Sequence, residues 1–342
     1  MAETAQSSNT PQRAGEQFFN AAEGIAADDD FSAYEEAARS DTTSLASSVL
    51  NYQYENGRRY HAYSQGKYLM PNDDTEQDRL DLVHHMFLLI LDGELFAAPI
   101  KQPQAILDLG TGTGIWAMDI ADEFPSARVI GNDLSPIQPA WVPPNLEFVV
   151  DDFEKDWIYD ENYFDFIHAR TLAGSVKDWK WLIRKAYNHL KPNGYFEAVE
   201  IDVWAWSDDS TLKDDSPYMQ YLRNLHEAGN RTGRKMNIAP NLKDWIKETG
   251  FEDVTESVYV VPLGPWPKDP KLKELGRWAY VGNPDAVDAY GLRVYTQVLG
   301  WEPDAAKIHL ALVKEQLRDK SLHGYSKVYV VYGRKPEPKP TA

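Results

Sequence analysis

The chain has 342 residues, of which 43% are hydrophobic and 26% charged, and its formal net charge at pH 7 is −18. This composition is ordinary for a globular protein, and the acidic excess argues against nucleic-acid binding, which requires clustered lysine and arginine. Because the chain contains no cysteine, disulfides, thiolate catalysis and cysteine-ligated zinc are excluded. No apolar run of about 18 residues and no signal-peptide pattern is seen, so we expect a cytoplasmic protein with no membrane partner.

The two ends of the chain differ in composition from the middle. Residues 1–45 are rich in acids, alanine and serine, which predicts a disordered acidic tail with at most a short helix near 31–38. Residues 337–342 are predicted to be a second disordered tail, because their prolines prevent regular pairing. Residues 46–336 are predicted to form a single domain, with an N-terminal lid at 50–100, a core at 101–201, and a cap with the final strands at 202–336.

Strand and helix patterns alternate from about residue 81 to 201. The predicted strands are 105–110, 127–135, 146–154, 164–170 and 195–201, and the predicted helices are 81–95, 115–125 and 181–194. Such alternation implies crossover connections and a parallel sheet that is covered on both faces. In these sheets ligands bind outside the carboxyl ends of the strands.

The second half of the chain is predicted to be mostly helical. Helical patterns occupy 217–251, 270–300 and 303–319, and strand patterns occupy 254–264 and 327–336. The last strand is expected to return to the same sheet. Residues 202–325 are therefore expected to be insertions and a cap on that sheet, rather than a separate domain.

The first predicted strand leads into a glycine-rich turn, Asp108-Leu-Gly110-Thr-Gly112-Thr-Gly114. Glycine allows positive φ and close approach of a ligand, and the following helix offers unpaired amides, so the turn predicts a nucleotide-like ligand. The run from Gly112 to Ala117 also fits the G-x-G-x-x-A form of dinucleotide sites, and Asp133 ends the next strand where a ribose-binding acid is expected. These features alone leave NAD and S-adenosylmethionine (SAM) open.

Two further acidic positions favour SAM. Asp108, just before the first glycine, is awkward beside a pyrophosphate but suits the amino group of a methionine moiety. At the end of the third strand, Asp151 or Asp152 can accept a hydrogen bond from an adenine amino group, and Phe153 can pack on the ring. SAM lacks phosphate and is cationic at sulfur, so an acidic site suits it, and SAM is the predicted cofactor.

The order of these motifs resembles the class I SAM-dependent methyltransferases. The motifs are "ILDLGTGTG", Asp133, "VVDDFE", "YFDFIHAR" and "HLKPNGYFE", within residues 104–200. The resemblance implies a Rossmann-like α/β fold with a mostly parallel seven-stranded sheet, helices on both faces and helical cap insertions. By this resemblance the methionine and ribose end of SAM is lined by Asp108, Gly110, Gly112 and Gly114. Asp133 would bind the ribose hydroxyls, and Leu134 would lie beside the adenine. Asp152 and Phe153 would hold the adenine itself, with Asp151 as the alternative to Asp152 if the register shifts by one.

A narrower resemblance covers residues 50–336. The segments "ENGRRYHAYSQGKYLMPNDDTEQDRLDLVHHMF", "HARTLAGSVKDW" and "HGYSKVYVVYGRKP" are similar to the LaeA-like family of fungal methyltransferases. Membership implies either an enzyme that methylates a small-molecule acceptor in secondary metabolite biosynthesis, or a regulator of secondary metabolism that binds SAM and velvet-type protein partners. The regulatory alternative would fit a nuclear location.

Two histidines are candidate catalytic bases. His168, at the end of the fourth strand, is placed to contact the methionine part of the cofactor or to act as a base, and His323 is a second candidate base. Arg170 could bind a carboxylate or pair with a surface acid. A base is needed only if the acceptor is protonated.

Aromatic residues occur in the sequence both before and after the predicted core at 101–201. Tyr60, with Tyr63 and Tyr68, either belongs to a lid that closes over the sulfonium, since aromatic faces attract cations, or packs the sheet edge. His84 and His85 lack a matched partner motif, so no metal is predicted. Tryptophans in the cap suit an aromatic acceptor pocket or an ordinary core equally well; they are Trp204, Trp206, Trp266 and Trp278.

Overall fold

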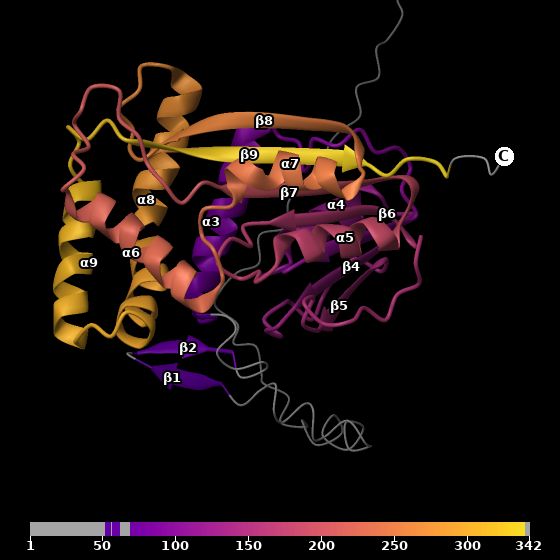
Figure 1. Cartoon of the computed structure of the whole chain (residues 1–342), viewed down its shortest axis with the longest axis horizontal. Helices are drawn as coiled ribbons and strands as arrows, with labels where there is room; N and C mark the ends of the chain where they lie inside the picture. The colour runs from indigo at the N-terminus through magenta and orange to yellow at the C-terminus, as the bar shows by residue number, and fades with distance from the viewer. Residues whose placement is uncertain (1–51, 56, 62–68, 339–342) are drawn as a thin grey trace, which may run out of the picture. The chain divides into compact units, whose positions relative to one another are not determined.

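A seven-stranded sheet forms the centre of the domain, in the order β5-β4-β3-β6-β7-β9-β8 (Figure 1). The computed structural model describes residues 52–55, 57–61 and 69–338. The strands are β3 (Ala105–Leu109), β4 (Arg128–Asp133), β5 (Leu146–Val150), β6 (Phe164–Arg170), β7 (Leu190–Ile201), β8 (Glu252–Pro262) and β9 (Tyr325–Arg334). All neighbours pair in parallel except β9, which is antiparallel to β7 and β8. The predicted fold class is confirmed.

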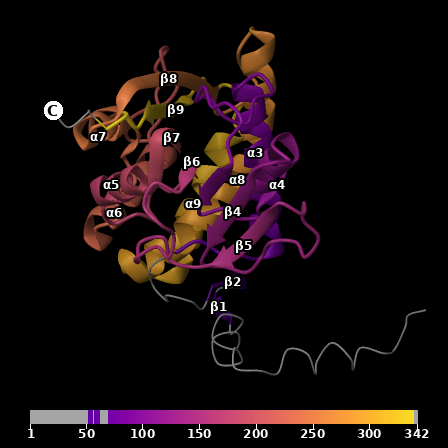
Figure 2. The same cartoon turned by 90° about the vertical axis from the view of Figure 1, so that its right-hand side faces the viewer.

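Helices cover both faces of this sheet, which explains why its central strands β3 and β6 are buried along most of their length. On β3, Leu107 and Leu109 pack in one core with α5 (Trp179–His189) and α7 (Leu242–Thr249). The intervening Ile106 faces the opposite core, which it shares with α4 (Ile115–Glu123). Figure 2 shows α5 and α7 on one side of the strands and α3 and α4 on the other.

A group of helices lies beyond the carboxyl ends of the parallel strands (Figure 1). It consists of α6 (Pro217–Thr232), α8 (Pro270–Arg293), the π-helical turn η2 (Val294–Val298) and α9 (Pro303–Leu317). These helices share an apolar core of their own, which includes Leu222, Tyr295 and Leu310. Helix α8 also packs against α3 (Asp74–Ile90) and β8, so this group is joined to the sheet.

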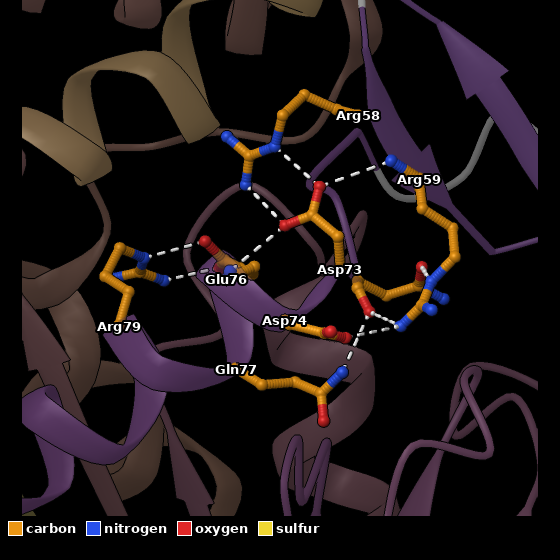
Figure 3. Close-up of polar contacts among 8 residues, drawn as sticks. Arg58, Arg59, Asp73, Asp74, Glu76, Gln77 and Arg79 are labelled. Carbon is orange, nitrogen blue, oxygen red and sulfur yellow. Dashed lines mark hydrogen bonds and ion pairs between the residues drawn. The ribbon is translucent and has the colours of Figure 1, made fainter.

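A short hairpin, β1 (Gln53–Glu55) and β2 (Arg58–Tyr60), precedes the first long helix and is not predicted by the sequence pattern. Figure 3 shows how it is held. The guanidinium of Arg58 donates to both carboxylate oxygens of Asp73, at 2.6 and 2.9 Å. Asp73 is also the N-cap of α3, where its Oδ1 accepts from the amide of Glu76 at 3.1 Å. One carboxylate therefore fixes both the hairpin and the start of the helix.

Several element boundaries differ from the sequence prediction by a few residues. The helix expected at 181–194 ends at His189, because residues 190–194 already belong to β7, with a register shift where Leu190 pairs Phe164 and Tyr195 pairs Phe166. The helix expected from residue 81 starts at Asp74, after the Asp73 cap. A short 3₁₀ turn, η1 (Ala239–Asn241), precedes α7, which ends before Gly250 with φ +110°. The tail predicted at 1–45, with its short helix, lies outside the described residues.

Candidate active site at the carboxyl edge of the sheet

The glycine turn between β3 and α4 is built on backbone conformations that other residues rarely adopt. Gly110, Gly112 and Gly114 have φ of +66°, +60° and +82°. A Cβ on Gly114 would lie 2.3 Å from the Phe148 ring, and one on Gly110 would lie 2.6 Å from Leu172. Gly114 is the N-cap of α4, so the amides of the helix start are directed to the same edge of the sheet.

Asp133, the last residue of β4, ties the turn to the neighbouring strand. Its Oδ2 accepts from the Gly112 amide and its Oδ1 from the Ser135 amide, both at 2.9 Å. Burial raises the pKa of Asp133 to about 6, the backbone hydrogen bonds oppose that rise, and the nearby Asp108 adds to it. The carboxylate is thus already oriented at the point where β4 ends.

Six of the predicted cofactor residues meet at one cavity of about 80 Å³. They are Gly110, Gly112, Asp133, Leu134, Asp152 and Phe153. Asp152 lines the cavity whereas Asp151 does not; Asp151 instead accepts from the Asp152 amide at 2.7 Å. Arg170 lines the cavity as well. Strand ends that are far apart in the sequence are therefore brought together as the parallel sheet requires.

Asp108 and His168 lie behind the glycine turn and do not line this cavity. They are paired across β3 and β6, and Asp108 Oδ1 lies 2.8 Å from His168 Nδ1 while Oδ2 accepts from the Thr111 hydroxyl at 2.6 Å. The His168 ring stacks on Trp116, with centroids 3.8 Å apart and planes at 9°. Burial lowers the pKa of His168, against the effect of Asp108. A neutral His168 that donates to Asp108 is consistent with this enclosure.

Arg170 connects the cavity to two further polar side chains, those of His84 and Asp119. Its guanidinium lies over the Phe87 ring at 4.9 Å and contacts His84 Nδ1 at 3.2 Å, while His84 Nε2 lies 2.8 Å from Asp119. Burial lowers the pKa of Arg170 to about 10, with nearby acids acting in the opposite direction. Both ring nitrogens of His84 are thus engaged by side chains.

Three other predicted site residues do not line the cavity. Gly114 belongs to the glycine turn but lies at the start of α4, outside the lining. Tyr60 is buried beneath the guanidinium of Arg293, 4.2 Å from its ring centroid. His323 is half-exposed, its Nδ1 lies 2.5 Å from Asp209, and it lines neither this cavity nor the larger one beside it. Tyr63 and Tyr68 of the expected lid lie outside the described residues.

A larger cavity, of about 190 Å³, adjoins the first one. Four residues line both cavities: Arg79, Leu80, Thr171 and Tyr290. Its walls are mainly apolar and aromatic, with Trp204, Tyr218 and Tyr221 among them, and of the four tryptophans singled out in the cap only Trp204 lines it. The sequence pattern did not reveal Arg79 and Tyr290, because they come from α3 and α8 rather than from strand ends.

The shared residue Arg79 is fixed within its own helix. Its guanidinium donates to both carboxylate oxygens of Glu76, at 2.7 and 2.8 Å, and both side chains are buried (Figure 3). The guanidinium also lies 5.5 Å from the centre of the Tyr290 ring. Burial raises the pKa of Tyr290, and Arg79 opposes that rise. A held arginine and a tyrosine therefore form the boundary between the two cavities.

Two acids at the end of β7 also face the ligand-binding edge and were not predicted as site residues. Glu200 and Asp202 both line the larger cavity. The oxygens of Glu200 accept from the amides of Leu172 and Ala173, at 2.6 and 3.1 Å. The run "AVEID" could have predicted them, because acids at the end of an apolar parallel strand lie at the ligand-binding edge of the sheet.

The fold and the glycine site define a class I SAM-dependent methyltransferase, and comparison with known proteins agrees. Residues 82–256 match the methyltransferase domain family. "Methyltransferase pytC" of Aspergillus terreus is 46% identical over 87% of this chain and 92% of its own length. The chain belongs to the LaeA-like family of fungal methyltransferases, whose methyl donor is SAM.

Other relatives carry a regulatory name. "Secondary metabolism regulator LAE1" of Cochliobolus heterostrophus is 38% identical over 84% of this chain and 95% of its own length. "Secondary metabolism regulator laeA" of Aspergillus flavus is 36% identical over 86% and 80%, respectively. No helix among residues 52–55, 57–61 and 69–338 is long and apolar enough to cross a membrane.

Proposed function

We propose that this chain transfers the methyl group of SAM to a small, largely apolar acceptor in fungal secondary metabolism. The observation that carries this proposal is the pair of adjoining cavities, one built on the glycine turn and the other lined by aromatic and aliphatic side chains. Methyl transfer needs a donor and an acceptor in direct contact, and the shared boundary of Arg79, Leu80, Thr171 and Tyr290 meets that need.

The smaller cavity has the donor set that SAM requires. Asp133 would accept hydrogen bonds from the ribose hydroxyls, and Asp152 would accept from the adenine amino group beside Phe153. Leu134 would lie against the adenine, and Gly110 and Gly112 would let the ligand approach the backbone closely. Asp108 acts through Thr111 and His168, to which it is bonded, by fixing the shape of the turn.

The bound SAM supplies a sulfonium-activated methyl group, so the chain itself needs only to hold the acceptor in line with it. Arg79, held by Glu76, and Tyr290, packed beside it, would orient the acceptor at the boundary of the two cavities. The apolar walls would exclude water from the reacting groups. A base is required only for a protonated acceptor, and neither His168 nor His323 lines a cavity from which it could act.

Calorimetric titration with S-adenosylhomocysteine (SAH) tests the cofactor site. Replacing Asp133 by Ala removes two acceptors at the ribose position and the anchor of Gly112, so we expect at least about a hundredfold loss of affinity. Asp160→Ala is the control, since Asp160 is an exposed acid that lines neither cavity. Binding of NAD in place of SAH would overturn the assignment.

A regulatory role is the second candidate function, because relatives of 36–38% identity are named secondary metabolism regulators. A regulator of this kind would bind SAM and velvet-type protein partners. Incubation of the protein with methyl-labelled SAM and a fungal metabolite extract separates the two. A labelled product supports the metabolite enzyme, whereas a stable complex with a velvet-type protein and no labelled product supports the regulator.

A further inference from the structure

Asp202 is a buried acid that the proposed methyl transfer does not yet use. It follows β7 directly, and its amide donates to the Lys327 carbonyl at 2.8 Å, which fixes its backbone at the wall of the larger cavity. Its exposed fraction is 3%, and its Oδ1 has no hydrogen-bond partner among the described residues. A buried acceptor without a partner is costly, so a site that retains one is prepared for a donor from outside.

The other charged groups in the cavity wall are already engaged. Among the described lining residues the charged ones are Arg79, Glu200 and Asp202. Arg79 is held by Glu76, and Glu200 is held by the amides of Leu172 and Ala173. The amide nitrogen of Asn283 donates to the Leu263 carbonyl at 3.3 Å. The wall therefore offers an acceptor at Asp202, but no spare cation for an anionic ligand.

Burial raises the pKa of Asp202 to about 6, and Lys327 opposes that rise. At neutral pH most of the Asp202 carboxyl groups are therefore ionised. Burial raises the pKa of Glu200 further, to about 8, with its two amide partners opposing. Asp202 is thus the stronger acceptor of the two and the one with a free oxygen.

The remainder of the wall is suited to an apolar molecule. Trp204, Tyr218, Tyr221 and Leu225 surround the cavity, and their rings and methyl groups offer contact area. We infer that Asp202 selects methyl acceptors that are apolar over most of their surface and carry one N–H or O–H group. That group donates a hydrogen bond to Oδ1 of Asp202. This inference rests on the proposed function in one respect, namely that the larger cavity holds the methyl acceptor.

Four small probes that share a phenyl ring on a three-carbon chain test the inference: 3-phenylpropan-1-ol, 3-phenylpropylamine, propylbenzene and 3-phenylpropanoate. Their affinities for the full chain, saturated with SAH, are measured by ligand-observed NMR titration. We expect the alcohol and the amine to bind at least about tenfold more tightly than propylbenzene, because each supplies the missing donor. The carboxylate should bind more weakly than propylbenzene.

Variants assign the preference to Asp202. Asp202→Leu should abolish the advantage of the alcohol and amine over propylbenzene. Asp202→Asn, which keeps the shape and one oxygen, should weaken the amine more than the alcohol and serves if the leucine variant does not fold. Glu197→Gln is the matched control: Glu197 lies on β7, the strand that leads to Asp202, is fully buried with its Oε1 unpartnered, and lines neither cavity.

Several outcomes would overturn the inference. Equal affinities for all four probes, no binding of any probe to the SAH-bound protein, or an unchanged preference in Asp202→Leu would each do so. The SAH titration of the same samples reports on the proposed function separately. A protein that does not bind SAH contradicts that function, whereas one that binds SAH but shows no donor preference contradicts only the role of Asp202.

Discussion

Gly112 and Gly93 both adopt positive φ, +60° and +95°, but only Gly112 lines the smaller cavity, where we propose that SAM binds. An added Cβ at Gly93 meets nothing within 4 Å, and one at Gly112 meets only Leu80, at 3.4 Å. Alanine should therefore cost each position about 1 kcal/mol of stability through backbone strain. Gly112→Ala should in addition weaken SAH binding by about tenfold or more, because the methyl group occupies the ligand side of the turn.

Calorimetry with SAH and urea denaturation of both variants measure the two effects separately. Gly93→Ala is expected to bind SAH as the wild type does. If both variants lose affinity equally, strain rather than ligand contact would explain the result.

His168 offers a second prediction at this scale. In His168→Asn the shorter side chain leaves Oδ1 of the buried Asp108 without its partner, so the free energy of unfolding should fall by about 2 kcal/mol or more. SAH affinity should fall with it, because Asp108 also holds Thr111 in the turn. The pH dependence of methyl transfer should keep its shape, measured as initial rates with labelled SAM. Loss of one limb of that profile would instead identify His168 as the base.

The sequence could predict the acids at strand ends but not every histidine near them. Asp133 and Asp152 reach the cavity because parallel strands bring their carboxyl ends to one edge. His168 is two residues before the end of β6, and its side chain stacks on Trp116 of α4 instead. His323 precedes β9 and bonds to Asp209, a contact across more than a hundred residues that no local pattern encodes.

At the scale of elements, the start of α3 depends on Asp73. Asp73→Ala removes both the helix cap and the ion pair with Arg58, and should lower the free energy of unfolding by about 2 kcal/mol. Asp73→Asn keeps an acceptor for the Glu76 amide and should cost about 1 kcal/mol. Asp74→Asn is the control, because the side chain of Asp74 is 94% exposed and its contact with Arg59 is 3.6 Å long.

Urea denaturation of the three variants decides this prediction. A loss in Asp74→Asn as large as that in Asp73→Ala would show that general charge, and not the cap with its ion pair, stabilises this end of the helix. Because α3 carries Arg79 into the cavity boundary, Asp73→Ala should also weaken binding of any acceptor more than Asp73→Asn does.

Elements with strong periodicity were predictable, and short or irregular ones were not. Apolar runs located all five strands from β3 to β7, since a buried parallel strand has few polar residues. The end of α5 was misplaced because Pro192 and Gly194 resemble a helix stop, whereas here they lie within the irregular start of β7. The strands of the β1–β2 hairpin are three residues long, too short for a detectable period.

At the scale of the whole molecule, buried groups with shifted pKa values act on stability in opposite directions. Burial raises the pKa of Glu197 to about 7 and that of Glu200 to about 8, so both bind protons more tightly in the folded state. Stability from such groups falls as pH rises toward the folded pKa. Burial lowers the pKa of His61 to about 4, and that of His226 as well, which instead makes stability rise with pH up to about 6.5.

Above about pH 6.5 the histidines are neutral in both states, whereas Glu197 and Glu200 continue to titrate up to about pH 8. Burial lowers the pKa of Lys185 to about 8, so that residue opposes them only at the upper end of this window. In that window the free energy of unfolding should therefore fall with pH, by up to about 1.4 kcal/mol per pH unit for each carboxyl that is still titrating. Urea denaturation at several pH values measures the slope. Glu200→Gln should reduce it up to about pH 8, whereas Glu197→Gln should reduce it only up to about pH 7, because each glutamine removes one titrating group. If the slope is unchanged in both variants, neither carboxyl is protonated in the folded protein near neutral pH. If the free energy of unfolding instead rises with pH across the window, the direction of both pKa shifts is contradicted.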